Sequence, residues 1–196
     1  MSFANIQRLA NTAVQSTNYF VDANVVIYAI QGDGVLAHWQ KRYSDFFYDI
    51  AESTLDPKPR IVMPTMLFSE ILNTWITKFA MDEYKTLNGI SRNDAFSFKR
   101  DYRPTQHYKD NYEKICDDVM SIKDALLFIN DSNVVTNPPL YISPVADPFD
   151  FNDYLYYQMC KEFQKSSPLT ILTNDGDFQI NDIPIVTLNR DLLALV

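Results

Sequence analysis

Short apolar runs that end in a polar residue alternate along this chain with segments of helical periodicity, and this alternation limits the possible folds more than any other feature. Strands that alternate with helices are typical of an α/β fold with a parallel sheet, in which ligands bind at the carboxyl ends of the strands. The pattern predicts strands at residues 19–22, 61–63, 169–173 and 183–188, and helices at residues 35–52, 65–80, 112–130 and 150–165.

Other segments carry weaker patterns. Residues 4–15 have helical spacing and predict a short leading helix, so that residues 1–18 form an N-terminal helical extension. Another helix is expected to open near Asn24, a residue type that favours the N-cap. Residues 82–111 have no clear period and are interpreted as an insertion within one domain that covers residues 1–196. Further strand candidates are Val134–Val135 and Leu140–Ile142.

Size and charge exclude some classes of protein. The chain has 196 residues, 46% of them hydrophobic, which is enough for one sizeable core. The net charge of −8 argues against a protein coated in basic surface for duplex DNA. It does not exclude a nuclease, because a site built from carboxylates is acidic until a metal ion enters it.

The chain lacks the marks of a secreted or membrane protein. Cys116 and Cys160 do not form a disulfide framework in a chain of this length and are interpreted as small buried hydrophobic residues. The first residues lack a signal-peptide layout, and no apolar run is long enough to span a membrane. A cytoplasmic location is therefore expected.

Acidic residues stand where two predicted strands end and where two predicted helices begin. Asp22 ends the first strand, and Asp175 follows the strand at residues 169–173. Asp153 lies in the first turn of one helix, and Glu70 lies on the polar face of another. In a doubly wound sheet these places meet at one edge, so the four carboxylates are expected to converge on one cleft. Converging carboxylates repel each other, and Mg²⁺ or Mn²⁺ relieves that repulsion in a site that suits phosphodiester hydrolysis.

Taken singly, each of these acids also has a structural interpretation. Asp150 and Asp153 near a helix start favour the helix dipole, and capping is the preferred role for Asp150. Asp177 is typical of a turn. Any one of the 25 acidic residues is more often structural than functional, and only their shared position favours a site.

Four segments, taken in order, resemble the PIN-domain family, which includes the VapC-like toxin ribonucleases of toxin–antitoxin modules. The first is a strand followed by an acid and an Asn, the second a helix with a central Glu, the third an aspartate before an apolar helix, and the fourth a Thr-x-Asp then Asp-Phe pattern. These segments are Phe20–Tyr28, Met63–Ile71, Asp153–Tyr156 and Ile171–Phe178, and Ile183–Val186 is similar to the family's last strand.

The resemblance implies a fold, an activity and partners. The fold would be a three-layer α/β/α sandwich with a central twisted parallel sheet, here with an extra helical insertion. The activity would be that of a metal-dependent endoribonuclease that hydrolyses single-stranded RNA with Mg²⁺ or Mn²⁺. A toxin of this family would bind an antitoxin protein and form a homodimer. By the same resemblance the catalytic and metal-binding acids are Asp22, Glu70, Asp153 and Asp175, with Asp177 as an additional metal ligand and Asn24 and Thr173 as hydrogen-bonding supports.

The most basic stretch of the chain is residues 91–109, where aromatic residues alternate with Arg and Lys. Cations hold the backbone of single-stranded nucleic acid, and aromatic faces hold its bases. One hypothesis is that this segment grips RNA beside the cleft; the other, which we favour, is that its aromatic residues pack on the core. The candidate substrate-binding residues are Arg92, Lys99, Arg100 and Arg103, and the interleaved aromatic residues are Phe96, Phe98, Tyr102 and Tyr108.

Two other classes of function stay open. A PIN-like module that binds nucleic acid or acts as a scaffold without turnover fits the same pattern, and a metal titration would separate it from a nuclease. A receiver-like or phosphatase domain needs an aspartyl nucleophile beside a Lys, and Lys123 and Lys161 lie outside the strand-end pattern. His38 and His107 lack partners for a catalytic dyad, and no P-loop, GxGxxG or nucleophile elbow is present.

Overall fold

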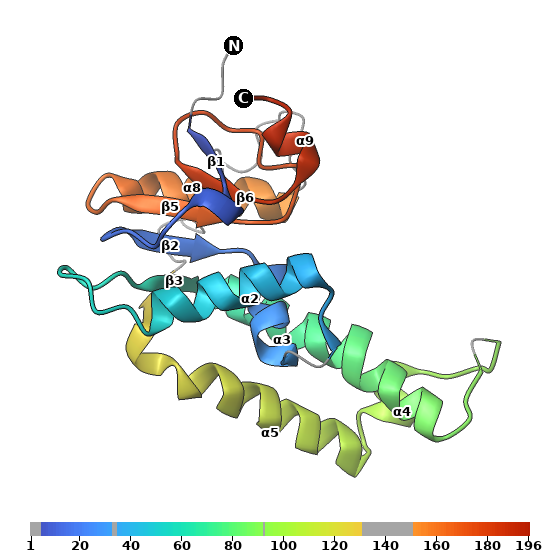
Figure 1. Ribbon diagram of the computed structural model, residues 1–196. Helices are drawn as coiled ribbons and strands as arrows, with labels where there is room; N and C mark the ends of the chain where they lie inside the picture. Colours follow the sequence, from blue (N-terminus) through green and yellow to red (C-terminus); the bar gives the residue numbers. More distant parts are fainter. Residues whose placement is uncertain (1–4, 33–34, 92, 131–150) are drawn as a thin grey trace.

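A six-stranded sheet forms the centre of the computed structural model, which describes residues 5–32, 35–91, 93–130 and 151–196 (Figure 1). The strand order is β1-β6-β5-β2-β3-β4, and every neighbouring pair is parallel. The expected α/β class with a parallel sheet is therefore confirmed. The strands are β1 (Ile6–Arg8), β2 (Asn18–Val21), β3 (Ile61–Pro64), β4 (Leu126–Ile129), β5 (Leu169–Leu172) and β6 (Ile185–Thr187).

Helices cover both faces of this sheet. Successive side chains on a strand point to opposite faces. The Tyr19 ring contacts Phe46 of α2 at a centroid distance of 5.8 Å, whereas the adjacent Phe20 contacts Tyr156 of α8 at 5.4 Å. In Figure 1, α2 accordingly lies in front of the sheet and α8 behind it. The helices are α1 (Ala23–Gln31), α2 (His38–Ala51), α3 (Thr65–Thr74), α4 (Met81–Leu87), α5 (Gln106–Ser121), α8 (Phe151–Gln164) and α9 (Arg190–Leu193), with 3₁₀ turns η1 (Leu9–Asn11) and η5 (Lys123–Ala125) and π-helical turns η3 (Trp75–Ala80) and η4 (Phe98–Tyr102).

The strand order reverses between β2 and β5. From β2 the chain continues outward to β3 and β4, whereas β5 pairs with the other side of β2 and leads to β6. All four residues of β3 and of β5 are buried, as expected for strands covered on both faces. In open parallel sheets, ligands bind outside the carboxyl ends of the strands at such a reversal. The residues that follow β2 and β5 therefore lie at the edge of the sheet where ligands bind in folds of this kind.

The predicted leading helix at residues 4–15 is wrong. Ile6–Arg8 form strand β1, which pairs with β6, and a single 3₁₀ turn follows. Ile6 and Leu9 are both buried, so their spacing of three imitated a helix. The Asn5 side chain donates to two carbonyl groups just before β6, and this contact more than 170 residues along the chain fixes the strand at the sheet edge. The spacing of apolar residues within a short segment gives no information about a strand partner so far away in the sequence.

The predicted helix at residues 112–130 is also wrong in its last part. Helix α5 ends at Ser121, and Leu126–Ile129 form β4, the edge strand beside β3. Phe128 is 51% exposed, as an edge position allows. Apolar residues near the end of α5 and in β4 continue the same spacing, so the pattern did not show where one element ended. The strand candidates Val134–Val135 and Leu140–Ile142 and the capping residue Asp150 lie outside the described residues.

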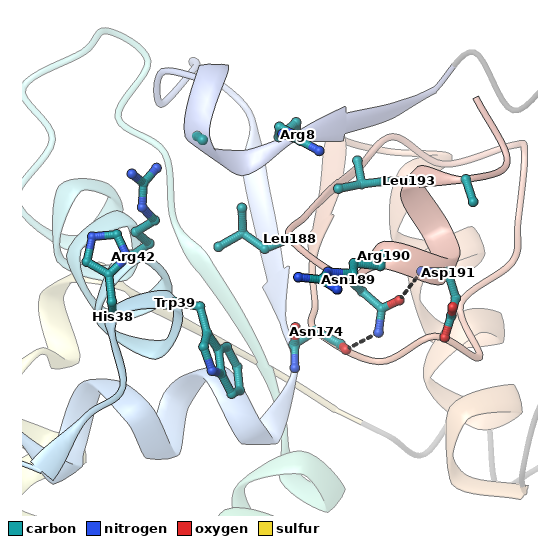
Figure 2. A pocket seen from close by; sticks show the side chains of 12 residues that line it. Arg8, His38, Trp39, Arg42, Asn174, Leu188, Asn189, Arg190, Asp191 and Leu193 are labelled. Carbon is teal, nitrogen blue, oxygen red and sulfur yellow. Dashed lines mark hydrogen bonds between the residues drawn. The ribbon is translucent and has the colours of Figure 1, made fainter.

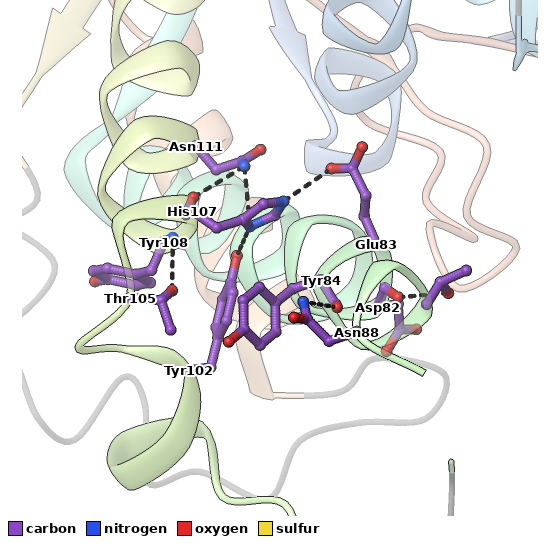
Figure 3. Close-up of polar contacts among 10 residues, drawn as sticks. Asp82, Glu83, Tyr84, Asn88, Tyr102, Thr105, His107, Tyr108 and Asn111 are labelled. Atoms are coloured by element: carbon purple, nitrogen blue, oxygen red, sulfur yellow. Dashed lines mark hydrogen bonds and ion pairs between the residues drawn. The ribbon is translucent and has the colours of Figure 1, made fainter. Parts of the chain in front are cut away.

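Residues 82–111 contain α4, η4 and the start of α5, and their aromatic residues pack together (Figure 3). Tyr102 is fully buried, with ring contacts to Tyr84 and His107. Its hydroxyl lies 3.1 Å from Nδ1 of His107, and Nε2 of that ring lies 3.4 Å from a carboxylate oxygen of Glu83. This packing agrees with the hypothesis that the aromatic residues of this segment pack on the core. It leaves less aromatic surface for RNA binding by residues 91–109.

The cations of the same segment differ in their surroundings. Arg100 forms two hydrogen bonds of 2.8 Å with Asp101, which raises the pKa of the guanidinium group. Lys99 and Arg103 are exposed, so contact with RNA stays a prediction for them. Arg92 lies outside the described residues.

Two expectations concern features away from the sheet. Cys116 and Cys160 are free thiols. Cys160 is buried as expected, which raises the pKa of its thiol, whereas Cys116 is only partly buried. Among the described residues, no helix combines the length and the apolar character that crossing a membrane requires.

Candidate functional site

Asp22 follows β2 at the reversal of the strand order and caps helix α1. The helix begins at Ala23, so the prediction that Asn24 is the N-cap is wrong by two positions. The Oδ1 atom of Asp22 accepts a hydrogen bond from the main-chain N–H of Asn24 at 3.3 Å. The Asn24 side chain is exposed, so this residue supports Asp22 through its main chain. The structure therefore corrects which of the two residues caps the helix, and the catalytic role of Asp22 stays a prediction.

Thr173, the residue after β5, joins the two strand ends. Its buried hydroxyl group donates to Oδ2 of Asp22 at 3.0 Å and accepts from the N–H of Asp175 at 2.9 Å. The Oδ1 atom of Asp175 accepts in turn from the N–H of Asp177 at 2.9 Å, which closes a turn of the kind that Asp favours. One hydroxyl group therefore fixes the spacing between Asp22 and the loop that carries Asp175 and Asp177.

Three of the predicted acids come close together. Among the described residues, Asp153, Asp175 and Asp177 each offer a carboxylate oxygen within 4.8 Å of the others. Asp153 comes from the first turn of α8, and the other two come from the loop after β5. Asp22 and Glu70 are not members of this group of three, so the structure brings the predicted acids together in two sets rather than one.

The two sets act on each other electrostatically. Burial raises the pKa of Asp22 to about 6, against hydrogen bonds from Thr173 and Asn24 that lower it, and the charges of Asp175 and Glu70 raise it further. Burial also raises the pKa of Tyr156, as do its hydrogen bond to Glu70 and the charges of Glu70, Asp22 and Asp153. All the predicted acids therefore lie within one region of negative potential.

Tyr156 is a site residue that the sequence patterns did not single out. Its hydroxyl donates to Oε2 of Glu70 at 2.5 Å and so fixes that carboxylate between α3 and α8. Both residues line a pocket of about 310 Å³ together with Asn73 and Asn152. Tyr156 stands three residues after Asp153 and therefore on the same helix face, a signal that could have identified it.

Tyr43 of α2 supports the loop from the other side. The ring is fully buried, and its hydroxyl lies 3.0 Å from the carbonyl oxygen of Thr173 and 3.1 Å from Oδ1 of Asn174. The same hydroxyl accepts from the N–H of Leu188 at 2.6 Å. No sequence signal pointed to Tyr43, because its partners lie more than 120 residues away.

Replacing Tyr43 by Phe should lower the free energy of unfolding by about 1–3 kcal/mol, because buried polar groups of the β5 and β6 loops would lose a partner. Urea denaturation monitored by circular dichroism measures the change. Tyr112→Phe is the matched control, since Tyr112 is 44% exposed and makes no side-chain hydrogen bond among the described residues. Equal stability of the two variants would contradict the role assigned to the Tyr43 hydroxyl.

Comparison with known proteins adds no assignment to this geometry. No model of a protein family, no curated protein and no solved structure matches the chain. The candidate site is therefore supported by the geometry of its own residues, and the resemblance to the PIN domain is supported by the four sequence motifs.

Proposed function

We propose that this chain is a metal-dependent endoribonuclease of the PIN type that hydrolyses phosphodiester bonds of single-stranded RNA. The observation that carries the proposal is the convergence of carboxylates from separate chain segments at the strand-order reversal. Asp153, Asp175 and Asp177 approach within 4.8 Å, and the charges that act on Asp22 come from other carboxylates. Carboxylates that converge at such a place repel one another, and a cation that joins them relieves this repulsion.

The donor set fits a hard divalent cation. Mg²⁺ and Mn²⁺ prefer oxygen ligands, and every candidate ligand here is a carboxylate. Asp153, Asp175 and Asp177 would hold the ion, and Asp22 and Glu70 would serve as further ligands. When bound, the ion supplies a Lewis acid that draws negative charge from a phosphodiester.

The residues around the acids keep them in place. Thr173 and the main chain of Asn24 hold the two oxygens of Asp22, and Tyr156 holds Glu70. Preorganised partners of this kind reduce the reorganisation that a site would otherwise undergo when it binds its ion. The helices on both faces of the sheet support the proposal of a three-layer PIN-like sandwich, with residues 82–111 as its insertion.

The proposal is tested by incubating the purified chain with labelled single-stranded RNA and Mn²⁺ or Mg²⁺. Cleavage within the strand is expected with either ion and should stop when EDTA is added. Single-stranded DNA of the same sequence serves as the comparison substrate. Absence of cleavage in both ions would reject the nuclease and leave a binding or scaffold module.

A toxin role with an antitoxin partner and a homodimer belong to the same proposal through the motifs alone, and a cytoplasmic location stays a prediction. A small DNA-binding protein encoded beside this chain, which blocks the cleavage when added, would support the toxin role. Size-exclusion chromatography with light scattering would test the dimer.

Replacing Tyr156 by Phe should weaken Mn²⁺ binding by roughly 10–100-fold, because hydrogen-bond partners that orient a ligand carboxylate affect metal affinity on this scale. The Phe ring keeps the contact with Phe20, so the helix packing should persist. Calorimetric titration with Mn²⁺ measures the effect. Tyr154→Phe, two residues earlier on the same helix, provides the comparison. Equal affinities of the two variants for Mn²⁺ would contradict the orienting role.

A further inference from the structure

A groove of about 1070 Å³ lies beside the acidic site, over the other half of the carboxyl edge of the sheet. Figure 2 shows its two walls: His38, Trp39 and Arg42 from the first turns of α2 face Arg8 and Arg190 across it. Arg8 ends β1 and Arg190 begins α9 after β6. Asp22 and Asp175 follow β2 and β5. The groove lies over the carboxyl ends of β5, β6 and β1, on the far side of β5 from β2.

The groove and the acidic site share one loop. Asn174 lines the groove and directly precedes Asp175. Its carbonyl oxygen accepts a hydrogen bond of 2.8 Å from the Asn189 side chain, which also lines the groove (Figure 2). A chain-like ligand that lies in the groove therefore passes the loop that carries Asp175.

The groove is a local concentration of positive charge on an acidic chain. Arg8, Arg42 and Arg190 are exposed, and none forms an ion pair with a carboxylate among the described residues. Asp191 is the one acid that lines the groove. Three guanidinium groups with free donors suit phosphate oxygens, which Arg binds in a bidentate manner.

Trp39 adds an aromatic surface to these cations. Its side chain is 42% exposed at the groove. Edge-to-face contacts with Tyr28 at 5.5 Å and Tyr43 at 6.4 Å hold the ring in place. An immobilised indole beside phosphate-binding cations is the arrangement on which single-stranded nucleic acids stack their bases.

We propose that this groove binds single-stranded RNA on one side of the bond to be cleaved, with Arg8, Arg42 and Arg190 on the phosphates and Trp39 on a base. This inference rests on the proposed function, because it places the strand relative to the acidic site. The volume of about 1070 Å³ leaves room for an extended ligand. Residues 91–109 are then not the principal binding surface.

The test measures the affinity of a fluorescein-labelled single-stranded RNA by anisotropy in EDTA, so that cleavage plays no part. The double variant Arg42→Glu with Arg190→Glu should bind RNA at least roughly tenfold more weakly than the unaltered chain. The magnitude of the slope of log K, where K is the association constant, against log salt should fall by roughly 1.4, or 0.7 for each phosphate contact that is lost. Trp39→Ala should weaken binding by roughly tenfold with little change in that slope.

The matched control is Lys58→Glu with Lys123→Glu, which changes the net charge equally. Both lysines are exposed and precede β3 and β4, so they lie near the amino ends of the strands. At about 0.15 M salt, where charges more than about 8 Å apart are screened, this variant should bind RNA as the unaltered chain does.

The outcomes separate the groove from the nuclease. Weakened binding in the groove variants but not in the control supports the groove, even if the unaltered chain cleaves nothing with Mn²⁺. Cleavage with Mn²⁺ together with equal binding by all variants would overturn the groove and leave the nuclease. No measurable binding by the unaltered chain, or tighter binding of duplex RNA, would also overturn it.

Discussion

Replacing Asp22 by Asn is expected to lower the rate of RNA cleavage by roughly 10³-fold, since a metal ion contributes several kcal/mol to the transition state and each factor of ten in rate is about 1.36 kcal/mol. The substitution removes a charge at almost constant volume. Asn is as good an N-cap as Asp, so the hydrogen bond from the Asn24 N–H can persist and α1 should keep its start. The amide NH2 group then faces Thr173, whose hydroxyl has to turn and accept a hydrogen bond where it donated one to Asp22. Loss of activity in a folded protein would therefore report on the carboxylate.

Single-turnover cleavage of labelled RNA measures this effect, and circular dichroism shows that the variant is folded. Asp49→Asn is the matched control, because Asp49 is an exposed acid near the end of α2, away from the strand ends that carry the site. It should cleave as the unaltered chain does. Asp22→Asn with full activity, or equal losses in both variants, would remove Asp22 from the proposed mechanism.

Manganese ions should stabilise the chain more at pH 7 than at pH 5. An ion at 100 times its dissociation constant adds about 2.7 kcal/mol, and a domain of this size gains about 2–4 °C in Tm for each kcal/mol, so an increase of about 5–10 °C is expected. The pH dependence follows from Asp22. Burial raises its pKa to about 6 in the folded chain, whereas an unfolded Asp has a pKa of about 3.9.

Between those two values the folded state holds a proton that the unfolded state has released, so stability without metal should fall as the pH rises from about 4 to about 6 and stay lower above that. Metal binding requires the charged carboxylate and therefore opposes this loss only at the higher pH. Thermal unfolding between these pH values, with and without Mn²⁺, measures both trends. Asp22→Asn should be more stable than the unaltered chain at pH 7 without metal. A metal-free stability that rises with pH through this range would contradict the cause assigned to the Asp22 pKa.

The sequence alone determined the parts of the fold and site that depend on local patterns. The buried strands β2, β3 and β5 appear as mostly apolar runs, because burial on both faces favours apolar residues along the strand. An acid that follows such a run at once, as Asp22 does, or within three residues, as Asp175 does, lies near a strand end, which is why both were found. The start of α3 after Pro64 and the place of Asp153 in the first turn of α8 were predicted for the same local reasons.

Only the tertiary structure decided the features that depend on contacts between distant segments. Strand β1 exists because its backbone pairs with β6, and that pairing overrides the helical spacing of Ile6 and Leu9. The hydroxyl groups of Tyr43 and Tyr156 find their partners across the sheet and between helices, where sequence separation hides them. Arg8, Arg42 and Arg190 look isolated along the chain. The parallel pairing of β1 with β6 brings Arg8 and Arg190 to one edge, and the packing of α2 places Arg42 at the same groove. Local patterns record which face of an element is buried, but the choice of neighbour is made by packing and hydrogen bonding over the whole chain.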